Sequence, residues 1–181
     1  MAKRVVRSLR GRGGYTLIEL LAVLTIFLIV VTSLTTLFVS GAKAELDANR
    51  RFEAQQAARV AVDQMRREIH CASALTLTSA SSITITLPAG CPSAGGTQVT
   101  VVYDTASAGT SRYKLRRTKS GGSTVPIADY LTTGSVFSYV APSTTALGQL
   151  HVDMPVNVYP NEAWKTWRLV ADIVLRNTTR A

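Results

Sequence analysis

The chain has 181 residues and a formal net charge of +9, a length that suits one domain with an extension. The first fourteen residues hold no acidic side chain and five basic ones: Lys3, Arg4, Arg7, Arg10 and Arg12. The rest of the chain has 15 basic and 11 acidic residues, a net charge of +4, so the overall charge is a weak argument for a nucleic-acid-binding domain.

An uncharged segment of 23 residues, from Leu20 to Ala42, follows the basic start. As a helix it would be about 34 Å long, enough to cross a hydrocarbon core of about 30 Å. Because basic flanks stay in the cytoplasm, we expect a cytoplasmic N-terminus and an exported C-terminal part. A cleaved secretory signal is an alternative, since Ala42-Lys43-Ala44 fits its cleavage pattern. However, the apolar region of such a signal usually has only about 7–15 residues.

A glutamate, Glu19, lies at the start of this apolar run, although a carboxylate within a membrane costs about 2.5–3.5 kcal/mol. It ends the sequence "GYTLIE", which begins with Gly14 and Tyr15 behind the basic leader. This pattern resembles the N-terminal signature of type IV prepilins and type II secretion pseudopilins. That signature has a glycine, an aromatic residue, a polar or small residue, two apolar residues and a glutamate. Tyr15 is the one departure, because phenylalanine is usual there.

The resemblance implies that a prepilin peptidase cuts between Gly14 and Tyr15 on the cytoplasmic face and then methylates the Tyr15 amine. The apolar helix would remain attached after the cut. We interpret Glu19 as the partner of a neighbouring subunit's Tyr15 amine, so that the ion pair would fix the register of subunits in a filament. The alternative is that Glu19 only extends toward the lipid headgroups.

A second helical segment follows the apolar run. From Ala42 to Ala74 no proline or glycine interrupts a stretch rich in helix-forming residues. Its apolar residues share one face, at alternating spacings of four and three: Ala58, Val62, Met65, Ile69 and Ala72. We expect one helix from about Thr16 to about Ala74, whose second half packs this face against a sheet.

After Ala74 the apolar period changes to two, which indicates strands. We expect seven, near residues 75–77, 83–87, 98–104, 111–118, 135–140, 150–158 and 167–175. Pro155 indicates an edge or bulged position for the sixth. The pattern predicts an α+β fold with a mostly antiparallel sheet, and the resemblance implies a pilin-like form. We divide the chain into a cleaved leader (1–14), a transmembrane or filament-core helix (15–41), an amphipathic helix (42–74) and an extracytoplasmic sheet domain (75–181).

The two cysteines, Cys71 and Cys91, could form a disulfide if the sheet domain is exported. Closing a loop of about 20 residues would stabilise the fold by about 3 kcal/mol. Two free buried thiols are the alternative. His70 adjoins Cys71, but no further ligand stands at a zinc-like spacing. With no phosphate-binding loop or hydrolase motif either, we expect no metal, no cofactor and no enzymatic activity.

Basic residues alternate along one predicted strand, with Arg112, Lys114 and Arg116 on one face. They could contact DNA phosphates during uptake, or they could form a solvated, charged edge strand. Two tryptophans near the C-terminus are candidates for a partner contact. We expect Trp167 in the core and Trp164 at the surface.

Further resemblances concern the sheet domain and the helix before it. The segment "QQAARVAVDQMRREI" and the order of the C-terminal strands resemble J-type pseudopilins and PilW-like minor pilins. They imply a structural subunit that enters or primes a type IV pilus or a type II secretion pseudopilus. Its partners would be the prepilin peptidase, other pilins or pseudopilins, and an inner-membrane assembly platform with its ATPase. It would be a single-pass protein of the cytoplasmic membrane before assembly. A pilus-tip module that binds DNA or a surface is the alternative.

Overall fold

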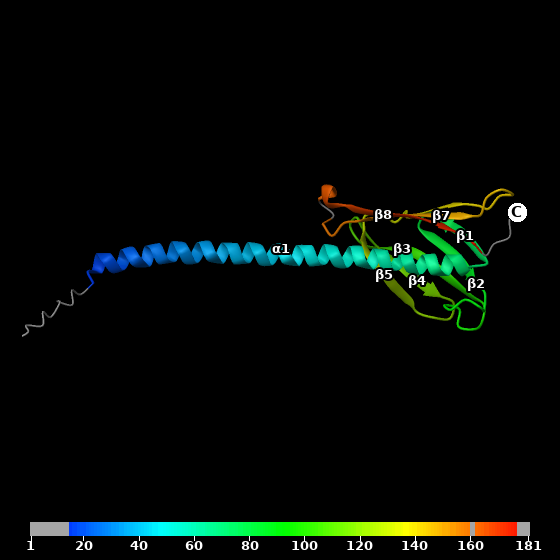
Figure 1. Cartoon of the computed structure of the whole chain (residues 1–181), viewed down its shortest axis with the longest axis horizontal. Helices are drawn as coiled ribbons and strands as arrows, with labels where there is room; N and C mark the ends of the chain where they lie inside the picture. The colour runs from blue at the N-terminus through cyan, green and yellow to red at the C-terminus, as the bar shows by residue number, and fades with distance from the viewer. Residues whose placement is uncertain (1–14, 160–161, 177–181) are drawn as a thin grey trace, which may run out of the picture. The chain divides into compact units, whose positions relative to one another are not determined.

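The computed structural model describes residues 15–159 and 162–176, and Figure 1 traces its elements in chain order. In this part of the chain, one long helix, α1 (Leu17–Cys71), precedes the strands. The strands are β1 (Ala74–Ser79), β2 (Ser82–Leu87), β3 (Val99–Gly109), β4 (Arg112–Lys119), β5 (Thr124–Leu131), β6 (Phe137–Val140), β7 (Gln149–Val156) and β8 (Trp167–Val174). A short 3-10 helix, η1 (Ala163–Lys165), precedes β8. The α+β fold predicted from the sequence, a long N-terminal helix and a C-terminal antiparallel sheet, is confirmed.

The chain forms two compact units, which divide within α1 after Leu46. In the first unit, every described residue from Tyr15 to Leu46 is exposed, although most of these side chains are apolar. The hydroxyl groups of this segment bond back to helix carbonyls, as Thr32 does to Leu28 at 2.7 Å. Such bonds satisfy a polar side chain within its own helix, so this segment suits an apolar environment.

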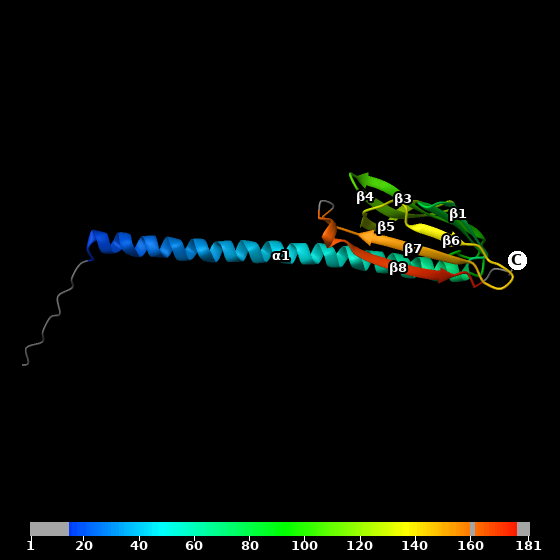
Figure 2. The ribbon, with the colours of Figure 1, turned by 90° about the horizontal axis from the view of Figure 1, so that it is seen from above.

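The second unit, which begins at Asp47, contains the sheet. Strands β1 to β5 follow one another as an antiparallel meander. Strands β6 and β8 both pair with β7, one on each side, as Figure 2 shows. The two groups of strands join where Leu131 of β5 pairs with Val156 of β7.

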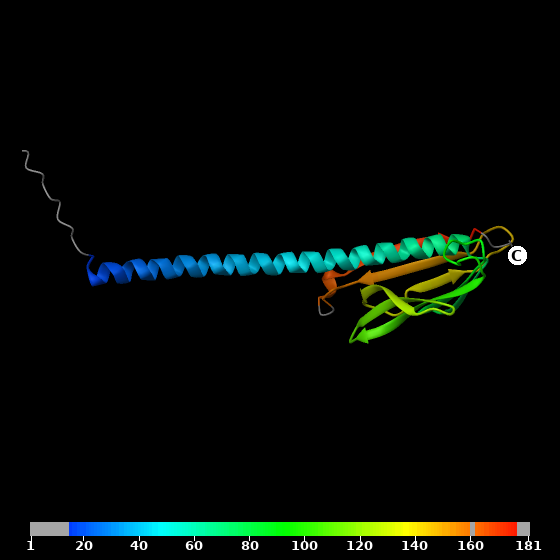
Figure 3. The same cartoon turned by 90° about the horizontal axis from the view of Figure 1, so that it is seen from below.

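From Asp47 onward, α1 lies along one face of the sheet (Figure 3). The face predicted from the spacing of four and three is the buried one, as Met65 and Ile69 are fully buried. It meets the inward side chains of the strands, including Ile83, Leu115 and Ile173. The predicted alternation of apolar and polar residues in β7 and β8 is also confirmed, because every second residue of each strand faces this core. Burial of these apolar surfaces is the main contribution that holds the second unit together.

Strand β5 is a strand that the sequence pattern did not indicate. The strand does not show a regular alternation of apolar and polar residues, because it contains Pro126 and pairs irregularly with β4. The register of this pairing shifts on both sides of Leu115. The shift places two residues, Asp129 and Tyr130, opposite one residue of β4, and Tyr130 adopts a φ of 63°. A bulge of this kind breaks the period of two on which strand prediction depends.

The expectation that Pro155 marks an edge or bulged strand was wrong, because β7 lies between β6 and β8 in a continuous register with β8. The Pro155 carbonyl accepts a hydrogen bond from the Thr132 N–H at 3.0 Å. The nitrogen and the carbonyl of one strand residue point to the same side, so the proline nitrogen faces the side of β7 on which β6 lies. Strand β6 begins at Phe137, which pairs with Val152, and therefore does not reach Pro155. A missing donor is tolerated there because the neighbouring strand does not extend to it.

The helix also ends slightly earlier than predicted, at Cys71 rather than near Ala74. The Ala72 N–H still bonds to the Glu68 carbonyl at 2.9 Å. The Ser73 N–H instead donates to the Thr86 carbonyl of β2, also at 2.9 Å. Pairing with β2 therefore takes over from the helical hydrogen bonds, and the chain turns directly into β1.

Candidate functional site

The start of α1 is organised by Thr16, which precedes the first helical residue. Its Oγ1 accepts a hydrogen bond from the Glu19 N–H at 3.4 Å, and its carbonyl accepts one from Leu20 at 3.2 Å. Thr16 thus acts as the N-cap, and the order Thr-x-x-Glu is that of a capping box. Glu19 lies in the first turn, where the helix dipole favours a negative charge. Sequence reasoning missed this local role, although the spacing of Thr16 and Glu19 was the signal.

Tyr15 and Glu19 are both accessible in the structure. Tyr15 is 80% exposed, and Glu19 is exposed as well. Among residues 15–159 and 162–176, no side chain pairs with the Glu19 carboxylate. Gly14 and the leader (1–14) lie outside the described residues, so the geometry of the expected cut is not seen. Two of the three predicted processing and assembly residues are therefore placed, four positions apart at one helix end.

The helix behind Glu19 is the one helix of the described residues that is long and apolar enough to cross a membrane. Its apolar side chains are outward on all sides in the first unit, as Leu21, Phe27 and Val31 illustrate. A helix that is apolar all round requires an apolar environment, either lipid or other helices. This is consistent with a single-pass membrane anchor.

Comparison with known families gives one match. Residues 9–35 match a family model described as the prokaryotic N-terminal methylation motif. The match includes Gly14, Tyr15 and Glu19 and reaches into the exposed apolar helix. It supports the type IV pilin or pseudopilin family and implies processing by a prepilin peptidase and assembly with other pilins in the membrane. No match was found among curated proteins or among solved structures.

The basic face of β4 is largely neutralised by acidic neighbours. Arg112 donates two hydrogen bonds to Asp129, at 3.0 and 2.7 Å, and Lys114 lies 3.6 Å from the same carboxylate. Arg116 pairs with Asp104 of β3. The hydrogen bonds with Asp129 raise the pKa of Arg112 above its usual value, although partial burial opposes this.

This arrangement bears on both interpretations of the basic residues. Because β4 lies between β3 and β5, the expectation of a charged edge strand was wrong. Three cations facing two carboxylates leave a small excess of positive charge. Nothing in this pairing favours a surface for DNA, whose phosphates require unpaired cations.

A buried ionic network between α1 and the sheet was not predicted from the sequence. Glu68 is only 2% exposed, and its carboxylate accepts hydrogen bonds from Arg117 at 2.8 Å and from the Tyr103 hydroxyl at 2.6 Å. Burial, followed by the bond to Glu68, raises the pKa of Tyr103 far above its usual value. Burial lowers the pKa of Arg117, but bonding to Glu68 outweighs it and raises the pKa overall. The position of Glu68 three residues after Met65, on the apolar face, was the available signal.

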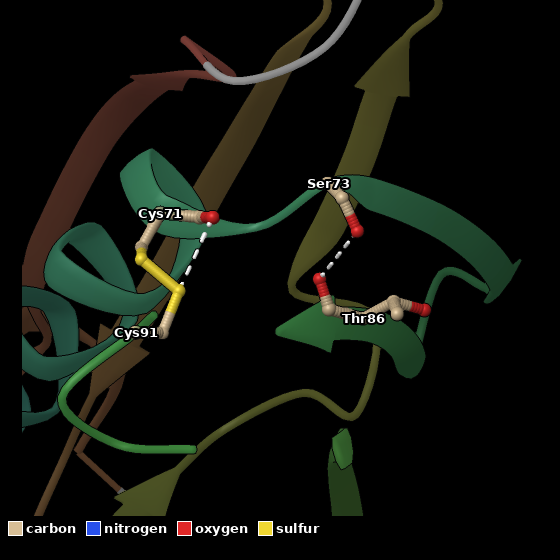
Figure 4. Close-up of a disulfide and its surroundings, with 4 residues drawn as sticks. All are labelled: Cys71, Ser73, Thr86 and Cys91. Atoms are coloured by element: carbon tan, nitrogen blue, oxygen red, sulfur yellow. Dashed lines mark hydrogen bonds between the residues drawn. A yellow bond between two sulfur atoms is a disulfide. The ribbon is translucent and has the colours of Figure 1, made fainter. Parts of the chain in front are cut away.

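The two cysteines meet at the end of α1, where Cys71 and Cys91 form a disulfide with their Cα atoms 6.0 Å apart (Figure 4). The bond ties the helix to the segment after β2. Close by, the Ser73 hydroxyl donates to the Thr86 carbonyl at 3.3 Å, which adds a second link between the same regions.

The histidines have structural contacts. His70 Nδ1 lies 2.9 Å from the Val174 carbonyl, and His151 Nδ1 lies 2.7 Å from Asp172. In the part of the chain that the structure describes, no group of three or more His, Cys, Asp or Glu side chains could hold a metal ion.

Proposed function

We propose that this chain is a minor pilin or pseudopilin, related to the J-type or PilW-like subunits, with a structural rather than an enzymatic role. The observation that carries the proposal is the processing motif, Gly14-Tyr15 with Glu19, at the exposed start of an exposed apolar helix. A cleaved secretory signal is discarded after export, so it would not need the Thr16 cap or a glutamate at the start of its apolar helix.

Before assembly, the apolar helix anchors the chain in the cytoplasmic membrane, with the leader in the cytoplasm and the sheet domain outside. A prepilin peptidase removes residues 1–14 and methylates the new amine at Tyr15. The helix then leaves the lipid for the core of a pilus or pseudopilus, where neighbouring helices replace the lipid around it. The assembly platform and its ATPase supply the energy.

Glu19 has two roles in this proposal. Within its own chain, its backbone N–H donates to the Thr16 hydroxyl that caps the first turn, and its carboxylate lies at the helix end that favours a negative charge. Between chains, its carboxylate, which pairs with no side chain among residues 15–159 and 162–176, binds the methylated amine of a neighbour, which is a cation that does not exist before cleavage. In a low-dielectric filament core this pair offsets the cost of burying each charge and rewards one register of the subunits.

Substitution of Glu19 by glutamine separates the two roles, because glutamine also completes a capping box but carries no charge. We expect Glu19→Gln to be cleaved and methylated normally but to be lost from sheared filaments. Glu45→Gln is the matched control, since Glu45 is an exposed glutamate of the same helix beyond the uncharged run. Normal incorporation of processed Glu19→Gln would show that the inter-subunit ion pair is not needed.

A further inference from the structure

One side of the sheet domain carries an aromatic cluster in which one ring, that of Trp164, is exposed to solvent. We define the aromatic cluster as Tyr159 and Trp164, together with Arg51 and Lys165. Trp164 lies on η1 and is 79% exposed, the most exposed large apolar side chain among the described residues from Asp47 onward. Trp167 packs partly against the core, as the sequence predicts. Only Trp164 therefore stands in solvent without a packing role.

One side chain, that of Asn157, links the described residues on both sides of Trp164. Asn157, which is only 5% exposed, donates hydrogen bonds to the Glu162 carbonyl at 2.9 Å and to the Thr166 hydroxyl at 3.1 Å. Its side-chain oxygen accepts a bond from the Tyr159 N–H at 2.8 Å. A single buried amide thus fixes both ends of η1, and the outward position of Trp164 is built into the domain.

The two cations of the cluster lie over its aromatic rings. The Lys165 ammonium lies 4.8 Å from the Tyr159 ring centre and 4.9 Å from that of Trp164. Arg51 lies 5.6 Å from the Tyr159 ring. Both cations also pair with a carboxylate, Arg51 with Asp47 and Lys165 with Glu162, each at 2.6 Å. Arg50 also lies beside Tyr159, so the cluster is amphipathic with a small excess of positive charge.

The length of the chain restricts where the cluster can lie. Asp47, whose carboxylate pairs with Arg51 of the cluster, follows the uncharged run by five residues. Five residues span at most about 18 Å in any conformation. The headgroup layer on each side of a bilayer is roughly 5–8 Å thick. While the apolar run crosses a membrane, Asp47 thus lies within about 18 Å of the end of that run, which allows the cluster to reach the headgroup layer.

We propose that the aromatic cluster is a lipid-contact face, with Trp164 inserted among the phospholipid headgroups while the chain waits in the membrane. Tryptophan and tyrosine are enriched at this level because their rings are apolar and their edges polar. Lys165 extends along the rings and keeps its charge at the polar edge, as lysines do near membrane surfaces. This inference rests on the proposed membrane-anchored state.

The chain offers its own optical test, because it contains only two tryptophans. The full chain with Trp167→Phe, which leaves Trp164 as the sole tryptophan, is reconstituted into phosphatidylcholine vesicles. A nitroxide quencher is placed either on the headgroup or deep in the acyl chain. We expect the headgroup nitroxide to remove most of the Trp164 emission and the deep nitroxide to remove little. The matched control is Trp164→Phe, whose remaining Trp167 is partly buried beneath Arg59 and should keep its emission.

Two outcomes would overturn the inference. If the chain floats with the vesicles but Trp164 is quenched no more than Trp167, the cluster does not touch lipid. If Trp164 becomes shielded only as the ratio of protein to lipid rises, its partner is a second copy of the chain. Failure of the chain to float at all would instead count against the membrane anchor, and hence against the proposed function itself.

Discussion

The buried Glu68–Arg117 pair gives a sharp test of how α1 is fixed to the sheet. Arg117→Met removes the cation and leaves the Glu68 carboxylate, which is 2% exposed, with the Tyr103 hydroxyl as its one partner among the described residues. Breaking one side of a buried pair costs about 3–5 kcal/mol. Because the Arg117 side chain is still 16% exposed, we expect the lower end of this range, about 3 kcal/mol. The measurement is urea-induced unfolding of the full chain in a mild detergent, followed by tryptophan fluorescence.

The neighbouring Arg116→Met variant is the matched control. Arg116 pairs with Asp104, but its side chain is 40% exposed, so the loss should be no more than about 1 kcal/mol. Adding Glu68→Gln to Arg117→Met removes the stranded charge and should recover part of the lost free energy of unfolding. If Arg117→Met and Arg116→Met destabilised the domain equally, the argument from a buried charge would be refuted.

Two further predictions concern the second unit. Cys91→Ser should lower the free energy of unfolding by about 3 kcal/mol, because the disulfide closes a loop of about 20 residues. If denaturant titrations gave the same stability for the reduced and the oxidised wild type, this prediction would be contradicted. Asp129→Asn should cost about 1 kcal/mol at neutral pH, since it breaks a partly exposed pair with Arg112. Burial raises the pKa of Asp129, but the hydrogen bonds from Arg112 and the Tyr130 N–H outweigh it and lower the pKa overall. The contribution of Asp129 is thus present above the unfolded pKa of about 3.9 and is lost as the pH falls through the lower folded value. The difference between Asp129→Asn and wild type should shrink as the pH falls below about 4, and a difference that grew in acid would contradict the assigned direction.

Much of the architecture could be predicted because it depends on periodicity. The spacing of Ala58, Val62 and Met65 identified the buried face of the helix, and the alternation in β7 and β8 identified their inward residues. The start of the helix could be read as well, since the motif and the absence of charge after Glu19 are local properties of the sequence. Each of these features involves residues close together in the chain.

The features that were missed depend on residues far apart in the chain. Glu68 and Arg117 are separated by 49 positions, and nothing in either segment indicates that they pair. The basic residues of β4 seemed free because their acidic partners, Asp104 and Asp129, belong to neighbouring strands. Strand β5 was hidden by a bulge, whose form depends on its pairing with β4. A single sequence shows charges and periods but not which strands meet.

The most direct test of the proposed function is the mass of the mature N-terminus, measured on protein purified from cells that contain a prepilin peptidase. Processing by the peptidase should leave a chain that begins at Tyr15 and carries one methyl group on its amine, with the apolar helix retained. A mature chain that begins at Glu45, or one that retains residues 1–14 in the presence of the peptidase, would contradict it.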